Sequence, residues 1–269
     1  MVICNKIIEL IPKGASRPVH AMGNDGQSWV VKVHGNPQGT KVLFNELISG
    51  RLACLLGISW PPVSPIELTG SAIDALNSHG VTVQSPFGVG IQFIPGLQPV
   101  PMPPGGYGDR TNFDERNRQH LSNLIPDVSH CSALYGKCVF DNWVLLQDCK
   151  YDTLCLDSAG QPMFLDASCA FGGLEWNEGA LRFDDTHIDV QSPFLHGILD
   201  NLDGYRPWLE RLDGLSQEIL LETLKEIPAA WDVPRNYLDA MQSFLSQTSP
   251  IFVQQFRDWI AYQRYLTST

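Results

Sequence analysis

A stretch dense in proline and glycine, GLQPVPMPPGGYGD (Gly96–Asp109), divides the 269-residue chain into two parts with different patterns. Proline cannot donate a backbone hydrogen bond and glycine favours irregular backbone, so this stretch predicts a linker or flap. Strand patterns dominate before it, and helical periodicity dominates after it. We therefore expect a β-rich lobe over residues 1–96, a linker over 97–112 and a helical lobe over 113–269.

The first lobe has the pattern of a small sheet with one helix. Lys6–Ile11 and Ser28–Val33 alternate or run apolar like strands, and Gly23–Gln27 has the composition of a tight hairpin turn. Glycine also permits close approach to phosphate, so the same turn is open to a nucleotide-covering interpretation. A helix fits Val42–Leu56, with one leucine- and isoleucine-rich face and Gly57 as its stop. Further strands are expected, at Trp60–Leu68 and Phe87–Gly96.

The second lobe combines helical segments with two acid-bearing segments. Asp148 lies in Val139–Asp157 and Asp166 in Met163–Gly173, each beside an apolar stretch that is typical of a strand or strand edge. A short turn, Ser158–Gln161, separates them. Two acids brought together across a hairpin can divide the work, one orienting a hydroxyl and the other holding a divalent metal on a phosphate. Helices are expected around them, at Asn117–Leu124, Pro126–Phe140, Glu218–Glu226, Asn236–Leu245 and Phe252–Tyr265.

Composition excludes several classes of protein. A formal net charge of -11 argues against nucleic acid as a partner, because binding its backbone needs clustered positive charge. No apolar run approaches the ~18 residues of a transmembrane helix, and the N-terminus has no signal-peptide layout. The seven cysteines show no paired spacing typical of zinc sites, so we expect reduced thiols and a cytoplasmic protein.

Four charged residues occur in the order that phosphoryl transfer from ATP requires. Lys32, in SWVVKV, follows a strand pattern and would neutralise the α- and β-phosphates. Glu46, in LFNEL, lies on the next helix and would hold that lysine. Asp148 would orient the attacking hydroxyl, and Asp166 would hold Mg²⁺ against the phosphates.

The chain resembles the HipA-like kinases, which share the phosphatidylinositol 3/4-kinase-like variant of the kinase fold. Trp29–Leu68 is similar to their N-lobe signature, a strand lysine followed by a turn and an Asn-Glu helix. Phe140–Leu154 is similar to their catalytic segment, Met163–Gly172 to their metal segment and Ile227–Trp231 to their C-terminal tail. The resemblance implies an α+β, bilobal protein-kinase-like fold that uses ATP and Mg²⁺.

The resemblance also implies roles for individual residues. Lys32 matches the nucleotide lysine, Glu46 its partner, Asp148 the catalytic aspartate and Asp166 the metal aspartate. The nucleotide would lie in the cleft near Lys32 and the hinge over Gln92–Gly96. The hinge residues expected to contact it are Gln92, Phe93 and Ile94.

The catalytic loop departs from the family pattern and is degenerate. Leu146 replaces an asparagine, Cys149 and Lys150 replace an arginine and a histidine, and Thr153 replaces the metal-binding asparagine. In the metal segment, Ala167 and Ser168 replace a histidine and a glycine. Three residues are candidate compensations: Thr153 and Asp152 as metal ligands and Lys150 as a stabiliser of phosphate charge.

These sequence features are compatible with three hypotheses of function. The first is an active kinase that phosphorylates a protein or small-molecule hydroxyl. The second is a pseudokinase that binds nucleotide or a partner without transfer. The third is the same scaffold used for other diphosphate chemistry, such as terpene cyclisation or nucleotidyl transfer. The third hypothesis is based on a DDxxxD arrangement formed by Asp184, Asp185 and Asp189, because clustered carboxylates can bind Mg²⁺ and a diphosphate. The same arrangement is also typical of a solvated acidic loop.

Overall fold

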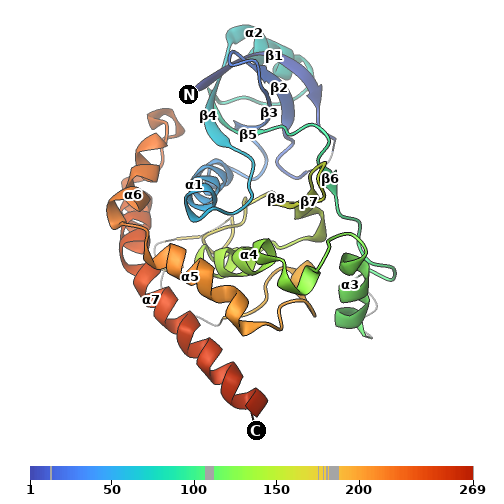
Figure 1. Ribbon diagram of the computed structural model, residues 1–269. Helices are drawn as coiled ribbons and strands as arrows, with labels where there is room; N and C mark the ends of the chain where they lie inside the picture. Colours follow the sequence, from blue (N-terminus) through green and yellow to red (C-terminus); the bar gives the residue numbers. More distant parts are fainter. Residues whose placement is uncertain are drawn as a thin grey trace.

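The protein has a small β-rich lobe above a larger helical lobe, as Figure 1 shows. The computed structural model describes residues 1–12, 14–106, 112–174, 176–177, 179, 181 and 188–268. The α+β, bilobal fold class that the sequence predicts is confirmed. The domain boundaries at residues 96 and 112 remain a proposal.

The N-terminal lobe is built on a closed barrel. Its strands follow the order β1-β2-β3-β5-β4, and a parallel pairing of β1 with β4 closes it. Their bounds are β1 Val2–Leu10, β2 Val19–Gly23, β3 Ser28–His34, β4 Val63–Leu68 and β5 Ser85–Gln92. A short helix that the sequence did not indicate, α2 (Gly70–Ser78), contacts β1. The barrel has its own apolar core, which includes Val31, Trp29 and Ile66.

The turn between β2 and β3 is the tight hairpin turn expected over Gly23–Gln27. Gly26 has a φ of 75°, a conformation that glycine adopts without steric cost. The Asp25 carboxylate accepts a hydrogen bond from the Gln27 N–H at 3.0 Å. Strand β3 then leaves this turn in a fixed register with β5, in which Lys32 pairs with Val89.

Helix α1 (Lys41–Leu56) lies between the barrel and the helical lobe (Figure 1). Gly57 ends it in the left-handed conformation, as expected. The expected single apolar face is wrong in one respect, because Leu55 is 38% exposed while Asn45 and Glu46 are fully buried. Both lobes cover this helix, so it is buried on nearly all sides and its polar residues need partners inside the protein.

The helical lobe surrounds a small antiparallel hairpin. Strands β7 (Leu154–Leu156) and β8 (Pro162–Phe164) pair directly, and β6 (Gln98–Pro99), from the expected linker, adds to β7. The lobe's helices are α3 Phe113–Ser122, α4 Ser132–Trp143, α5 Arg206–Asp213, α6 Gln217–Glu222 and α7 Arg235–Ser268. None of the helices in the described part of the chain is long and apolar enough to cross a membrane.

Two expectations for this lobe are wrong. The two terminal helices are one helix, α7, which continues through Pro250. Phe244 and Phe252, before and after the proline in the sequence, are buried, and α7 contacts α4, α5 and α6. This packing outweighs the hydrogen bond that proline cannot donate. The apolar run from Val139 is the end of buried helix α4 rather than a strand edge, because a short apolar run fits either structure.

An ion pair is buried inside the helical lobe, between Lys137 and Asp141 on α4. Lys137 is 1% exposed and Asp141 is 0% exposed. The Ser192 hydroxyl donates to the other Asp141 oxygen at 2.5 Å. Substitution Lys137→Met is expected to lower the free energy of unfolding by about 3–5 kcal/mol, because it leaves the Asp141 charge buried without its partner. Urea denaturation measures this change.

Two controls separate the buried pair from a general effect of losing lysine. Lys225→Met removes an exposed, solvent-screened ion pair with Glu222 and should leave the unfolding free energy close to that of wild type. The double variant Lys137→Met/Asp141→Leu should regain much of the lost stability, because no buried charge then remains. Equal effects of Lys137→Met and Lys225→Met would contradict the prediction.

Candidate active site

A cavity of about 780 Å³ lies where the two lobes meet. Its walls come from the β1–β2 loop, strand β3, the end of β5 and the loops around the β7–β8 hairpin. Every site residue named from the sequence lines it except Glu46, which lies behind Lys32. These lining residues are Lys32, Gln92, Phe93, Ile94, Asp148, Lys150, Asp152, Thr153 and Asp166.

Lys32 is the centre of a polar cluster on the cavity wall. It projects from β3, is only 6% exposed and forms a buried ion pair with Glu46 of α1. Its Nζ also lies 3.2 Å from an Asp166 carboxylate oxygen. The sequence order of Lys32, Glu46 and Asp166 thus becomes one contact network across three elements.

Ser168 joins the same cluster, although no functional role for it was apparent in the sequence. Lys32 Nζ donates to its hydroxyl oxygen at 2.6 Å, and that hydroxyl lies 2.9 Å from Glu46 Oε1. The Ser168 N–H also donates to Asp166 Oδ1 at 3.2 Å. A glycine at this position would supply the N–H but not the hydroxyl.

The charges of this cluster support one another. Burial alone would lower the pKa of Lys32, but Glu46 and Asp166 raise it above its usual range. Burial raises the pKa of Glu46 and would also raise that of Asp166. The positive charge of Lys32 and the hydrogen bonds that the Asp166 carboxylate accepts outweigh this effect. They lower the pKa of Asp166 well below its usual range, so Asp166 is a carboxylate at neutral pH.

The lowered pKa of Asp166 predicts how stability depends on pH. An acid with a lowered pKa in the folded state stabilises that state above its unfolded pKa of about 3.9 and loses this contribution as pH falls below it. The difference in unfolding free energy between wild type and Asp166→Asn should therefore stay constant above about pH 5 and shrink below about pH 4. Urea denaturation across this pH range tests it; a difference independent of pH would refute the charge coupling.

The backbone of the Asp166 segment is held by α1. Asp166 itself has a φ of 62°, an uncommon left-handed conformation that aspartate tolerates better than most residues. Asn45 Nδ2 donates to the carbonyl oxygens of Ser168 at 2.7 Å and Ala170 at 3.1 Å. Its side-chain oxygen accepts from Trp176 Nε1 at 2.9 Å. Asn45 is therefore a structural support of the site, visible in the sequence only as the residue before Glu46.

Asp148 reaches the cavity from a loop between α4 and β7. Asp148 precedes β7 and Asp166 follows β8, so both lie at the same end of the hairpin and line the same cavity. Their loops are joined by backbone hydrogen bonds, including Gln147 N–H to the Cys169 carbonyl at 3.0 Å and Phe171 N–H to the Val144 carbonyl at 2.6 Å. Asp148 is 43% exposed along its side chain and forms an ion pair with Lys150.

The residues that replace the kinase pattern in this loop differ in the polar groups that they present to the cavity. Leu146 is 3% exposed and packs in the core, so it contributes no polar group to the cavity. Thr153 donates its hydroxyl to the Lys150 carbonyl at 2.7 Å, which leaves oxygen lone pairs free. Asp152 is exposed beside it. In the described part of the chain, no three acidic, histidine or cysteine side chains converge as a ready-made metal site.

The β1–β2 loop contributes residues that the sequence interpretation missed. Gly14, Ala15 and Ser16 line the cavity, whereas none of Gly23–Gln27 does. The nucleotide-covering interpretation of Gly23–Gln27 therefore does not fit, since these residues form the β2–β3 turn. The sequence signal that could have identified these residues is their position, because residues 11–18 connect the first two strands.

The hinge follows β5. The Phe93 N–H donates to the Ser28 carbonyl at 2.8 Å, which ties the hinge to the barrel. The Phe93 ring is 41% exposed and lies 4.5 Å from the His20 ring, centroid to centroid. Of the DDxxxD arrangement, Asp184 and Asp185 lie outside the described residues. Asp189 is tied to α4 through Asn142.

Comparisons with known proteins agree with this geometry. Residues 4–102 match the family model of HipA-like kinases. No curated protein matches the chain. The structure of the proinflammatory kinase CtkA of Helicobacter pylori superposes with a TM-score of 0.66 at 11% identity, covering 97% of this chain and 99% of that one.

A second similar structure is the Golgi casein kinase with Mn and ADP bound. Its TM-score is 0.51 at 12% identity, and the match covers 94% of this chain and 73% of that one. At these identities both structures show the fold alone. The resemblance to HipA-like kinases is therefore confirmed through residues 4–102, and the chain as a whole has a bilobal kinase fold.

Proposed function

We propose that this kinase-like protein is an ATP- and Mg²⁺-dependent phosphotransferase that acts on a hydroxyl group of a protein or a small molecule. The observation that carries the proposal is the contact network of Lys32, Glu46 and Asp166 at the wall of a cavity that Asp148 also lines. A buried lysine held by two acids is suited to neutralise phosphate, because its ammonium is fixed and stays protonated.

The nucleotide binds in the 780 Å³ cavity, whose size is within the usual range for ligand sites. Gln92, Phe93 and Ile94 contact its base at the hinge. Lys32 neutralises its α- and β-phosphates, and Glu46 keeps Lys32 in position. Gly14 and Ser16 lie in the loop that would cover the phosphates.

Asp166 is the principal ligand for Mg²⁺, with Asp152 and Thr153 as further oxygen donors. The side chain of Asp166 is 48% exposed although its backbone is firmly held, so its carboxylate faces the cavity in a fixed place. Mg²⁺ prefers a few carboxylate oxygens, water and phosphate, and this donor set fits that preference. The bound ion would neutralise charge that develops on the phosphates.

Asp148 orients the acceptor hydroxyl and takes its proton during transfer. It is exposed enough to meet an acceptor at the mouth of the cavity. Lys150, its ion-pair partner, stabilises charge on the transferred phosphoryl group. The acceptor, the nucleotide as partner and the cytoplasmic location remain predictions. The seven free thiols support only the predicted location.

Calorimetric titration tests the proposal. ATP is titrated with and without Mg²⁺, and the nucleotide products are then analysed by mass spectrometry. We expect binding that strengthens with Mg²⁺ and slow formation of ADP. The proposal would be refuted if ATP bound neither with nor without Mg²⁺ and remained intact.

A second candidate is a pseudokinase that binds nucleotide without transfer. It is favoured by the burial of Leu146, which offers no polar group, and by the ion pair that occupies Asp148. The same titration separates the two candidates, because the pseudokinase binds ATP but leaves it intact after prolonged incubation with general protein acceptors.

A further inference from the structure

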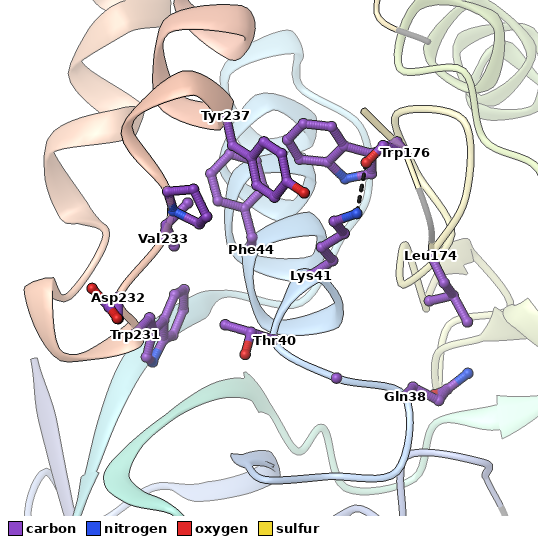
Figure 2. A pocket seen from close by; sticks show the side chains of 12 residues that line it. Gln38, Thr40, Lys41, Phe44, Leu174, Trp176, Trp231, Asp232, Val233 and Tyr237 are labelled. Carbon is purple, nitrogen blue, oxygen red and sulfur yellow. Dashed lines mark hydrogen bonds between the residues drawn. The ribbon is translucent and has the colours of Figure 1, made fainter. Parts of the chain in front are cut away.

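A second cavity, of about 290 Å³, lies beside the N-terminal turn of α1. Figure 2 shows it between α1, the chain around Leu174 and Trp176, and the start of α7. Gln38, on the turn between β3 and α1, lines both this cavity and the active-site cavity. None of the residues assigned to phosphoryl transfer lines it.

Aromatic rings form much of its wall. Phe44, Trp176 and Trp231 are each 2% exposed or less and form the backing of the cavity, whereas Tyr237 of α7 is partly exposed and presents its ring to it. The Trp176 ring lies 5.1 Å from the Tyr237 ring and 5.6 Å from the Phe44 ring, between centroids. Flat, rigid apolar walls of this kind bind planar rings with little loss of conformational freedom.

One side of the cavity carries positive charge. The Lys41 ammonium donates to the Trp176 carbonyl at 2.7 Å and lies 4.9 Å from the Tyr237 ring centroid. An ammonium has three donors, so the bond to Trp176 leaves donor capacity for a ligand. Thr40, which precedes the helix, makes no side-chain capping bond, so the positive end of the 16-residue α1 adds to this charge.

The single acid among the residues that line the cavity does not cancel this charge. Asp232 lies on the opposite side of the cavity from Lys41 (Figure 2). A cationic ligand would be repelled by Lys41, and a neutral ring would leave the ammonium without a counter-charge. A bare inorganic anion would leave the aromatic walls unfilled.

We propose that this cavity binds a small planar aromatic molecule that carries one anionic group, such as an aromatic carboxylate. The ring packs against Tyr237 and the partly exposed apolar side chains of Val233 and Leu174, and the anionic group accepts hydrogen bonds from Lys41. The proposal is independent of phosphoryl transfer, because none of the residues assigned to that reaction lines the cavity.

A matched pair of probes tests it on the unmodified protein. Indole-3-acetate and its neutral amide have nearly the same shape and differ in charge. Isothermal titration should give an affinity roughly 10-fold or more higher for the acetate, the gain expected from a hydrogen bond to a charged group. Equal affinities, or failure of the acetate to bind at millimolar concentration, would overturn the proposal.

Variants locate the binding. Lys41→Met should lower the affinity for indole-3-acetate about 10-fold, whereas Lys6→Met, an exposed lysine on β1, should not change it. Val233→Trp should block the cavity without removing Lys41. Urea denaturation of each variant verifies folding. Affinity that survives Lys41→Met and Val233→Trp but falls in Lys150→Met would place the probe in the active-site cavity and refute the proposal.

Discussion

Substitution of Asp166 by asparagine is expected to reduce Mg²⁺-dependent phosphoryl transfer by roughly 10³-fold. The amide keeps the size of the side chain but loses the negative charge that faces Lys32 and the cavity. Two functions are lost together, since the carboxylate would bind Mg²⁺ and also holds Lys32 with Glu46. Transfer rates and ATP affinities, each measured over a range of Mg²⁺ concentrations, report the change.

Two further aspartates serve as controls for this variant. Asp74→Asn removes an exposed carboxylate on α2, far from the cavity in sequence and fold, and should leave transfer unchanged. Asp152→Asn tests the second metal ligand and should raise the Mg²⁺ concentration needed for half-maximal activity. If Asp166→Asn kept the wild-type affinity and activity, the metal assignment would be wrong.

Asp148→Ala is expected to leave ATP binding intact and to lower transfer by roughly 10²–10⁴-fold, the usual contribution of a general base. Asp148 pairs with Lys150, whereas Lys32 pairs with Glu46 and Asp166, so the nucleotide contacts proposed for Lys32 remain. Single-turnover measurements at saturating ATP separate this loss from a change in affinity.

Lys150→Met is the matched comparison for Asp148→Ala, because it removes the other half of the ion pair. It frees the Asp148 carboxylate but removes a cation from the cavity. Transfer should therefore fall less than in Asp148→Ala. Activity of Asp148→Ala equal to that of wild type would exclude the catalytic role.

Local patterns in the sequence predicted much of the N-terminal lobe. The turn over Gly23–Gln27 and the end of α1 at Gly57 each depend on a glycine with positive φ, a requirement that a short stretch of sequence reveals. The strand that carries Lys32 is an apolar run, and the helix that carries Glu46 is rich in leucine and isoleucine and ends at Gly57. Their contact follows once the helix lies against the barrel.

Features that depend on distant contacts were not predictable in this way. The continuous helix through Pro250 is stabilised by side chains that pack against other elements, which local propensity does not include. Asn45 gains its importance from carbonyl groups more than 120 residues away, such as that of Ser168. The contribution of Ser16 to the cavity likewise depends on how the barrel meets the helical lobe.

Burial of Asn45 and Glu46 on α1 has a consequence for ligand binding. Both side chains are fully buried and bonded to the Asp166 segment, and Glu46 also holds Lys32. Displacing α1 would leave several buried polar groups unsatisfied, at about 1–3 kcal/mol each. The groups proposed to bind phosphate are thus preorganised, and the binding free energy of a nucleotide need not be spent on assembling them.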